Sequence, residues 1–555
     1  MYIIDRKAVR IKIVFSQTLY SQSIASVSMG SLTAHLRSSG FETDLCFLDK
    51  GDTVSFETRL GGVGDYIIIA KPNFKDFPIM FPLLERLKSF GGAKRIFLCG
   101  PFAQLNADKL MSQFGWLDGV FIDQLEASSV RLLSTMSEDF VNWDLLSPGS
   151  ISRDTQSGLV GKYVPLSAPI PLSNIPFPAR DIEMKEDVSY VNIEASRGCL
   201  FNCSFCHIPL VSKLPKNGSS LNVRDPVLVV DEIERLNKKL GKTLFIFNDS
   251  CFWSSEKDDA RILRFCEEIT RRKLDVRFYV YMRGEPFVGD EVLLALVKAG
   301  LVRIFLGIEN HSESSLVRFR KKIGPNSYEI LKKKLDPLGV NIHIGYITFE
   351  PHSSLDDILS NIEYLFRIGK LFRLGVILEP VRVIPGTVLQ SELIKEGLMS
   401  SELSFDEVTY GYRFEHEEVG RLLGEWKKLF EGQLKKVAYR FEYYSTVGDI
   451  LKILSERLDP RFSLLLNGRC QIFAAKRLEG MNLLLEYFRL SIDSVRHGMC
   501  GSVGCVKQNR RFTDEFTQVT EALGVLYRDI VSFVKENGGE RAVREVYLEV
   551  DTQMV

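Results

Sequence analysis

The chain has 555 residues, which is too long for one ordinary hydrophobic core, so we expect about three domains. Hydrophobic residues make up 45% and charged residues 26%, as in a soluble globular protein. The 71 basic and 71 acidic residues balance, which argues against a nucleic acid or an anionic membrane as a partner. No apolar run is long enough to span a membrane, and charges interrupt the apolar stretch at the start, so we predict a cytoplasmic protein.

The first 145 residues alternate short apolar runs with amphipathic stretches. We expect strands over residues 9–16, 41–48, 65–72, 94–101 and 118–123, and helices over 29–40 and 78–92. Strands that alternate with helices indicate a parallel sheet covered on both faces. A ligand site is expected beyond the carboxyl ends of these strands, in the loops 16–19, 71–74, 100–102 and 124–126.

The rest of the chain divides into three parts. Residues 146–188 are rich in Pro, Ser and Gly, and their prolines prevent a regular helix, so we expect an extended linker. A second alternating series predicts a barrel or partial barrel of about six β/α units, with strands over 190–196, 243–249, 276–282, 302–309, 341–349 and 375–384. From residue 393 to 555 the helical periodicity predicts a mostly helical C-terminal domain.

Three of the ten cysteines lie within eight residues, in the segment SRGCLFNCSFCHIP. Thiolates are soft ligands that suit zinc or an iron–sulfur cluster, and a loop that supplies only three of them leaves one metal position open. Buried structural thiols and a zinc site completed by His207 are alternatives. The letters CSFCH also match a c-type haem attachment sequence, but that haem is attached after export, and we see no export signal.

The spacing of Cys199, Cys203 and Cys206, with Phe205 before the last cysteine, resembles the signature of the radical S-adenosylmethionine (SAM) superfamily. In that family the three cysteines hold a 4Fe–4S cluster, and SAM binds the remaining iron. The later segments FNDSCF, YMRGEPF, GIEN and IPGT resemble the family's SAM-contacting motifs in the same order. The resemblance implies these SAM-binding residues, in addition to Phe205: Asn248, Asp249, Arg283, Glu309, Ile384, Gly386 and Thr387.

The N-terminal segments MGSLTAHLRSSGFETDLCFLD, CGPF and GVFIDQLEAS are similar in order to the cobalamin-binding domain that precedes some radical SAM barrels. This implies cobalamin as a third cofactor, contacted at the strand ends by Ser16, Thr18, Leu19, Lys71, Asn73, Gly100, Pro101, Phe102, Gln124 and Glu126. None of the seven histidines lies in a D-x-H-x-x-G loop, so we expect no histidine ligand to cobalt. The alternative is a degenerate domain that only packs.

Taken with the chain pattern, the resemblance implies an α/β fold with a doubly wound, Rossmann-like cobalamin-binding domain (1–145), a linker (146–188), a partial (β/α)6 radical SAM barrel (189–392) and a mostly helical C-terminal domain (393–555). It also implies a 5′-deoxyadenosyl radical that takes hydrogen from an unactivated carbon of a small-molecule substrate, and methyl transfer from methylcobalamin. A flavodoxin- or ferredoxin-type protein would supply electrons. A cyclase or ring-rearranging enzyme and a non-catalytic, redox-sensing iron–sulfur protein are the alternatives, and no catalytic side chain is assigned.

The remaining cysteines give weaker signals. Cys500 and Cys505, with Cys470, are candidates for an auxiliary cluster, but free thiols on a loop are the favoured interpretation. Four more cysteines lie in expected strands or helices and are predicted to be core residues: Cys46, Cys99, Cys251 and Cys266. The helical C-terminal domain is expected to shape the substrate pocket.

Overall fold

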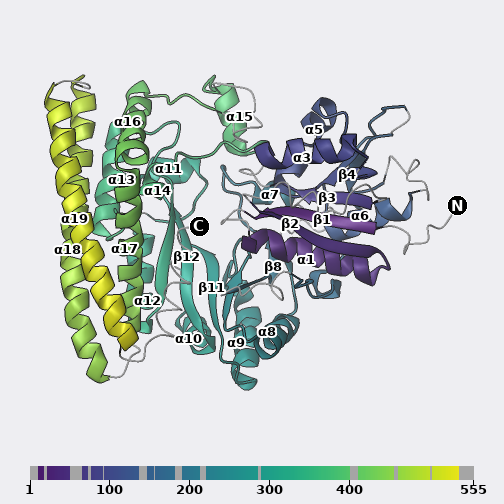
Figure 1. The fold of residues 1–555 in the computed structure, drawn as a ribbon, viewed down its shortest axis with the longest axis horizontal. Helices are drawn as coiled ribbons and strands as arrows, with labels where there is room; N and C mark the ends of the chain where they lie inside the picture. Colours follow the sequence, from purple (N-terminus) through teal and green to yellow (C-terminus); the bar gives the residue numbers. More distant parts are fainter. Residues whose placement is uncertain are drawn as a thin grey trace.

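The computed structural model describes residues 10–17, 22–49, 66–72, 77–91, 93–136, 147–154, 157–181, 190–212, 221–284, 289–324, 326–399, 411–455, 460–499 and 503–536. The described chain forms two mainly parallel sheets followed by a set of long helices (Figure 1). The predicted α/β class with a helical C-terminal region is confirmed.

The first sheet has the strand order β2-β1-β3-β4-β5-β6. All neighbouring strands are parallel except β6, which runs antiparallel to β5. The sequence pattern predicted the first five strands but not β6, which is short and lies in the proline-rich segment. Their bounds are β1 (Arg10–Gln17), β2 (Glu42–Asp49), β3 (Tyr66–Lys71), β4 (Arg95–Leu98), β5 (Gly119–Phe121) and β6 (Ser150–Ser152).

Helices cover both faces of this sheet, which explains why its strands are almost continuously apolar. Alternate residues of β3 enter two separate cores: Ile67 and Ile69 face α1 and α6, whereas Ile68 and Ala70 face α3, α4 and α5. Figure 1 shows these two helical layers on opposite sides of the strands. The helices are α1 (Gln22–Ser38), α3 (Phe77–Ser89), α4 (Pro101–Leu105), α5 (Ala107–Gln113) and α6 (Leu125–Ser134).

The second sheet is parallel throughout, in the order β13-β12-β11-β10-β7. A separate antiparallel pair is formed by β8 (Ser196–Gly198) and β9 (Leu221–Val223), and β8 follows β7 directly in the chain. The five strands of the sheet agree with five of the six predicted ones. They are β7 (Val191–Ile193), β10 (Leu244–Phe247), β11 (Arg277–Arg283), β12 (Leu301–Glu309) and β13 (Asn341–Tyr346).

The sixth predicted strand, over residues 375–384, is wrong. The structure has the short helix α14 (Leu374–Ile377) there, followed by an irregular segment. Pro380 and Pro385 cannot donate backbone hydrogen bonds to a ladder, and among the described residues Val381 N–H bonds only the carbonyl of Phe349. The segment therefore does not form a sixth strand of the sheet.

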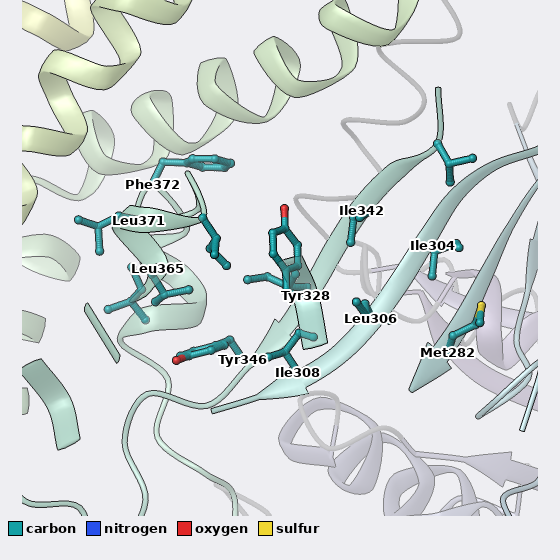
Figure 2. Packing of buried hydrophobic residues seen from close by; sticks show 14 of the residues in the cluster. Met282, Ile304, Leu306, Ile308, Tyr328, Ile342, Tyr346, Leu365, Leu371 and Phe372 are labelled. Carbon is teal, nitrogen blue, oxygen red and sulfur yellow. The ribbon is translucent and has the colours of Figure 1, made fainter. Parts of the chain in front are cut away.

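One face of the second sheet packs against helices in a continuous apolar core (Figure 2). Figure 2 shows Ile304, Leu306 and Ile308 of β12 in the same cluster as Tyr328 of α12 and Leu365 near the end of α13. The helices of this domain are α7 (Ile208–Val211), α8 (Pro226–Leu240), α9 (Asp259–Arg271), α10 (Asp290–Ala299), α11 (Glu313–Arg318), α12 (Ser327–Leu335), α13 (Leu355–Arg367) and α15 (Val388–Lys395). Short 3-10 turns are at Leu172–Asn174, Glu256–Asp258 and Asp336–Leu338.

Local signals set the ends of these helices. Helix α8 begins at Pro226, which has no N–H to leave unpaired, and the Asp225 carboxylate accepts a hydrogen bond from Val227 N–H. It ends at Gly241, whose φ of 63° is the left-handed conformation that glycine adopts without strain. Helix α13 has a capping box, in which Ser354 and Asp357 each bond the other's backbone N–H.

The C-terminal helices lie on the side of the second sheet that faces away from the first sheet (Figure 1). α16 (Glu417–Lys427) continues through a π-helical segment, Lys428–Gln433, to α17 (Lys435–Ser455). The long pair α18 (Pro460–Arg496) and α19 (Val503–Glu536) packs against α13, α16 and α17. Among the described residues, α18 and α19 contribute none to the pocket between the two sheets, and the expectation that the C-terminal region shapes the substrate pocket stays a prediction.

Candidate active site

The three cysteines lie on one loop, between β8 and α7, just beyond the carboxyl end of β7. Their side chains are partly buried. Backbone bonds hold the loop from both sides: Ser204 N–H donates to the Phe319 carbonyl (3.2 Å), and Leu389 N–H donates to the Ser204 carbonyl (2.9 Å). The loop is thus fixed between the end of α11 and the start of α15.

Cationic side chains surround the cysteine loop. Arg283, at the end of β11, donates to Cys203 Sγ (3.2 Å) and stacks 3.7 Å from the Phe201 ring centroid. Lys321 Nζ lies 2.9 Å from Glu309 Oε1 and donates to the Gly307 carbonyl (3.0 Å). Positive charge beside a thiol favours the thiolate, which is the form that binds metal.

The pKa values of the thiols show these effects and the opposing effect of burial. A hydrogen bond with Cys251, the Phe201 N–H and the charges of Arg283 and Lys321 lower the pKa of Cys199. Burial raises the pKa of Cys203, and it raises the pKa of Cys206 to about 12. A metal centre must therefore displace protons from the last two thiols when it binds.

A large pocket lies between the two sheets. It has a volume of about 1380 Å³, counting the space at its open mouth. One wall comes from α1 and the carboxyl ends of β3, β4 and β5; the opposite wall comes from the segments that flank the cysteine loop, including Arg197, Gly198, Ile208 and Val211. The strand order of the first sheet reverses between β1 and β3, which is where doubly wound sheets bind their ligands.

Comparison with known proteins identifies the second domain. The family profile of the radical SAM superfamily matches residues 193–370. These residues are a radical SAM domain.

The whole chain has the fold of cobalamin-dependent radical SAM enzymes. It superimposes on the cobalamin-dependent S-adenosylmethionine radical enzyme OxsB with aqua-cobalamin bound, with a TM-score of 0.67 over 98% of this chain and 84% of that chain, at 18% identity. The radical S-adenosylmethionine methyltransferase TsrM from Kitasatospora setae, with cobalamin and a [4Fe-4S] cluster bound, gives a TM-score of 0.56 over 72% of this chain and 77% of that chain, at 16% identity.

Two curated relatives show sequence similarity. The anaerobic magnesium-protoporphyrin IX monomethyl ester cyclase of Rubrivivax gelatinosus is 25% identical over 308 residues, which are 52% of this chain and 53% of that protein. The hopanoid C-3 methylase of Methylococcus capsulatus is 27% identical over 235 residues, 42% of this chain and 43% of that protein. The matched segments span only about half of these relatives. Among the helices that the structure describes, none combines the length and apolar character of a membrane span.

The cysteine loop of the radical SAM domain fits the cluster that this family implies. Its three thiols are the donor set, and the neighbouring Arg283 and Lys321 supply positive charge that favours their thiolate form. Within the described residues, no three His, Cys, Asp or Glu side chains converge to hold a single metal ion. A 4Fe–4S cluster does not require such convergence, because each thiolate binds a different iron.

The residues that the sequence predicted to contact SAM fall into two groups. Asn248 lines the pocket, and Glu309 and Arg283 lie beside the cysteine loop at the carboxyl ends of β12 and β11. Asp249 is instead buried, where its carboxylate accepts from Ala195 N–H (3.0 Å) and Ser196 Oγ (2.5 Å). Burial raises the pKa of Asp249 to about 6. Its visible role is to hold the start of the cysteine loop.

The IPGT segment lies against the other side of the cysteine loop. Thr387 caps α15, accepting from Gln390 N–H and donating to the Ile384 carbonyl (2.7 Å). Gly386, at φ 75°, is exposed, and a Cβ there would be 3.5 Å from Leu210 of α7. Phe205 packs edge-on against Phe319, with ring centroids 5.1 Å apart, so its ring anchors the cysteine loop to the end of α11.

The residues predicted to contact cobalamin fall into three groups: some line the pocket, some are buried away from it, and some lie outside the described residues. Lys71, Gly100, Pro101 and Gln124 line the pocket. Phe102 is 2% exposed and belongs to the core under α3, and Glu126 is 1% exposed and does not line the pocket. Thr18, Leu19 and Asn73 lie outside the described residues, and so does the side chain of Ser16.

Sequence reasoning missed several pocket residues because their contacts cross between segments far apart in the chain. Asp123 accepts from Tyr163 Oη (2.7 Å) and Leu166 N–H (2.7 Å), and the Gln124 amide bonds both backbone groups of Ile170. These bonds fold the proline-rich segment over the pocket, where Leu166 and Pro169 line it. Other lining residues that the sequence analysis missed include Ser28, Met29, Gln104, Glu194, Ser196, Arg197, Asn222 and Ser250.

The other cysteines have mixed outcomes. Cys99, Cys251 and Cys266 are buried, as predicted for core residues, and Cys46 is partly buried against the same core as α3. Cys251 also lies beside Cys199, which the sequence did not suggest. Cys470 is part of α18 and packs against the main core, whereas Cys500 and the Cys505 side chain lie outside the described part. The auxiliary-cluster hypothesis therefore stays a prediction.

Proposed function

We propose that this protein is a cobalamin-dependent radical SAM methyltransferase that acts on an unactivated carbon of a small molecule. The pocket between the two sheets supports this most strongly, because it lies between the ligand-binding edge of a doubly wound domain and the segments that flank the cysteine loop of a radical SAM domain. A cofactor in this pocket would lie next to a cofactor on that loop. The corrinoid-bearing OxsB and TsrM have the same fold.

The pocket wall fits a corrinoid. The macrocycle needs a broad apolar surface, and its amide side chains need polar partners around the edge. Val27, Met29, Leu125 and Leu166 offer apolar surface, and the rim carries the polar side chains of Ser28, Gln104, Asp123, Gln124, Asn222 and Asn248. Gly100, at φ 88°, lets the Lys71 side chain lie along the wall, since a Cβ there would be 3.0 Å from Lys71 Cγ.

For the radical SAM domain we propose that Cys199, Cys203 and Cys206 bind the 4Fe–4S cluster. Asn248, Arg283, Glu309 and the segment Ile384–Thr387 would bind SAM, with Phe205 supporting the loop. The proposed boundaries remain 1–145, 146–188, 189–392 and 393–555.

When bound, these cofactors supply a 5′-deoxyadenosyl radical and a transferable methyl group. The chain's own residues orient the cofactors and limit the access of water to them. Arg283 holds the Cys203 thiol, and Lys321 fixes the Glu309 carboxylate at the ends of neighbouring strands. The proline-rich segment, bonded to Asp123 and Gln124, covers the pocket and limits the access of water. We propose a flavodoxin- or ferredoxin-type protein as the electron donor.

A second candidate is a cyclase or ring-rearranging reaction with the same cofactors. The similarity to a magnesium-protoporphyrin ester cyclase over 308 residues favours it, and the site geometry does not separate the two reactions. The by-products of the two reactions distinguish them. Radical methyl transfer with SAM as both methyl and radical source yields S-adenosylhomocysteine and 5′-deoxyadenosine together, whereas cyclisation does not consume a methyl group.

The test is anaerobic reconstitution of the full chain with iron, sulfide and cobalamin, followed by incubation with SAM, a reductant and a small-molecule cell extract. Mass spectrometry should find a product 14 mass units heavier than a depleted compound, together with S-adenosylhomocysteine. A product without added methyl and without S-adenosylhomocysteine would establish the cyclase alternative. Iron binding without any SAM cleavage would support a redox-sensing protein.

A further inference from the structure

Arg197 connects the cysteine loop to the N-terminal domain. It stands two positions before Cys199, and its guanidinium crosses the boundary between the two sheets. Nη1 donates to Glu126 Oε2 (3.0 Å), and Nη2 lies 2.9 Å from Glu126 Oε1. Nε donates to Glu194 Oε2 (2.8 Å), at the end of β7. A two-pronged arginine–carboxylate pair fixes direction as well as distance.

The N-terminal side of this contact is built from two helices. Glu126, in the first turn of α6, is 1% exposed, and the Ser31 hydroxyl of α1 donates to its Oε1 (2.8 Å). Arg197 Nη2 also donates to Ser31 Oγ (3.3 Å). One arginine thus contacts α1, α6 and the end of β7, and α1 itself packs against β7.

Four ionisable side chains lie close together around this contact. They are Lys71, whose pKa is lowered by burial, and Arg197, Glu126 and Glu194, which influence it electrostatically. Three of them, Lys71, Glu194 and Arg197, line the pocket. Removing Arg197 leaves the carboxylate of Glu126, which is 1% exposed, without its charged partner, and this is costly unless Glu126 is neutralised as well.

We propose that Arg197 is a positioning residue whose pairing with Glu126 and Glu194 sets the separation between a corrinoid in the pocket and the cluster on the cysteine loop. This rests on the proposed function. Among the described residues, two further ion pairs join the same parts of the chain: the partly exposed pair of Arg37 with Asp181, and the buried pair of Arg180 with Glu232 of α8. Both act through the connecting segment, whereas Arg197 is in the strand that leads directly into the loop.

The matched control is Arg272. Like Arg197, it is a largely shielded arginine with several carboxylate partners in the radical SAM domain. All of its partners, Asp231, Glu234 and Glu268, lie on α8 and α9, away from the domain boundary. Arg272→Gln therefore removes a similar network without touching the contact between the sheets.

The first experiment uses the full chain reconstituted with cluster and cobalamin. Pulsed dipolar electron paramagnetic resonance measures the coupling between cob(II)alamin and the reduced cluster. Arg197→Gln should keep wild-type iron and cobalamin content but give a broader distance distribution; Arg197→Lys should recover it in part, and Arg272→Gln should match the wild type. A wild-type distribution in Arg197→Gln would overturn the proposal.

The double variant Glu126→Gln/Arg197→Gln separates positioning from folding. It removes both charges together, so it should regain any stability that Arg197→Gln loses, while the distance distribution stays broad. If Arg197 only stabilises the fold, the single variant instead loses bound cofactor, and the molecules that remain loaded keep the wild-type distance. That result would also refute the positioning role.

A second readout needs no cobalamin. Amide hydrogen exchange of the unloaded chain should be faster in α1, α6 and residues 196–206 of Arg197→Gln than in the wild type, and unchanged there in Arg272→Gln. If the wild type fails to bind cobalamin, the proposed function fails, yet faster exchange would still show that Arg197 fixes the two sheets together. Equal exchange in Arg197→Gln and Arg272→Gln would reject the contact itself.

Discussion

At the scale of single residues, the cysteine loop is supported by a few side chains that lie at the ends of different strands. Arg283 comes from β11, Glu309 from β12, and Asp249 from the end of β10. The three parallel strands end at one edge of the sheet, so residues far apart in the chain meet there. This explains why short motifs in a fixed order carry the site.

The thiols themselves give the first prediction. Each of Cys199→Ala, Cys203→Ala and Cys206→Ala should lose most bound iron and abolish SAM cleavage, because the loop offers no replacement ligand of the same softness. Iron analysis and 5′-deoxyadenosine formation measure this. Cys470→Ala, on α18, is the control and should retain both. Near wild-type cleavage in any loop variant would show that the cluster assignment is wrong.

Glu309 gives the second prediction, and its backbone provides a matched pair of variants. Its φ of 71° is rare for a non-glycine residue and costs about 1 kcal/mol or more. Glu309→Ala and Glu309→Gly should both weaken SAM binding by about 1.5–3 kcal/mol, as expected for a lost charged hydrogen bond. Glu309→Gly should unfold at higher denaturant concentration than Glu309→Ala. Calorimetric titration that finds unchanged SAM affinity in both would reject the role of the carboxylate.

At the scale of elements, helix α15 is attached to the second sheet by a charged histidine. His352 Nε2 lies 2.8 Å from Glu396 Oε2 at the end of α15, and its Nδ1 lies 3.3 Å from the buried Glu350 carboxylate. Hydrogen bonds with Glu350 and then Glu396 raise the pKa of His352 to about 9. The helix that follows the IPGT segment is thus held by a protonated imidazole.

This pairing predicts a pH dependence of stability. A raised pKa in the folded state means that the contribution is complete below the unfolded pKa of about 6.5 and is lost as the pH rises through about 9. Urea unfolding of the wild type should therefore show declining stability between those values, and His352→Gln, which cannot be charged, should decline less. Parallel profiles for the two proteins would contradict the pairing.

The packing of the connecting segment on α1 gives the fourth prediction. A Cβ at Gly30 would lie 2.5 Å from the Ala179 carbonyl oxygen, and Ala179 N–H donates to the Gly30 carbonyl (2.9 Å). Gly30→Ala should lower the free energy of unfolding by about 1–3 kcal/mol, because backbone must move. Gly424→Ala on α16 meets nothing within 4 Å and should raise it by up to about 1 kcal/mol through helix propensity. Denaturant unfolding compares them, and a stabilising Gly30→Ala would disprove the close contact.

At the scale of the whole molecule, the two sheets turn their ligand-binding edges toward one another. The pocket belongs to neither domain alone, since α1, β3, β4 and β5 form one wall and the flanks of the cysteine loop form the other. Burial lowers the pKa of His207, which stands next to Cys206. No histidine among the described residues lines the pocket.

The fifth prediction follows from that composition. Cob(II)alamin bound to the full chain should show no triplet splitting from an axial nitrogen in its electron paramagnetic resonance spectrum, because no imidazole reaches the pocket from the described residues. His35→Ala, on α1, should give the same spectrum as the wild type. Clear nitrogen splitting would refute the absence of a histidine ligand, and its loss in His35→Ala would identify that residue as the ligand.

Local pattern predicted most elements correctly, and it failed where local pattern lacks the deciding information. Five strands of each sheet follow from apolar runs between turn residues, but β6 has only three residues and forms through its pairing with β5. The run at 375–384 is apolar like a strand, yet its prolines exclude it from the ladder. Asp249 resembles a site residue by position, although its carboxylate bonds Ala195 and Ser196.

The sequence by itself determined the chemistry of the cysteine loop, because three thiolates at that spacing on a strand-end loop are a property of contiguous residues. It also determined the alternation of strands and helices that builds both parallel sheets. Only the tertiary structure decided which residues face the pocket, since that depends on how the two sheets meet. Arg197 reads in the sequence as one residue of the cysteine motif; the buried Glu126 across the boundary, 71 positions earlier, gives it a partner that no local pattern contains.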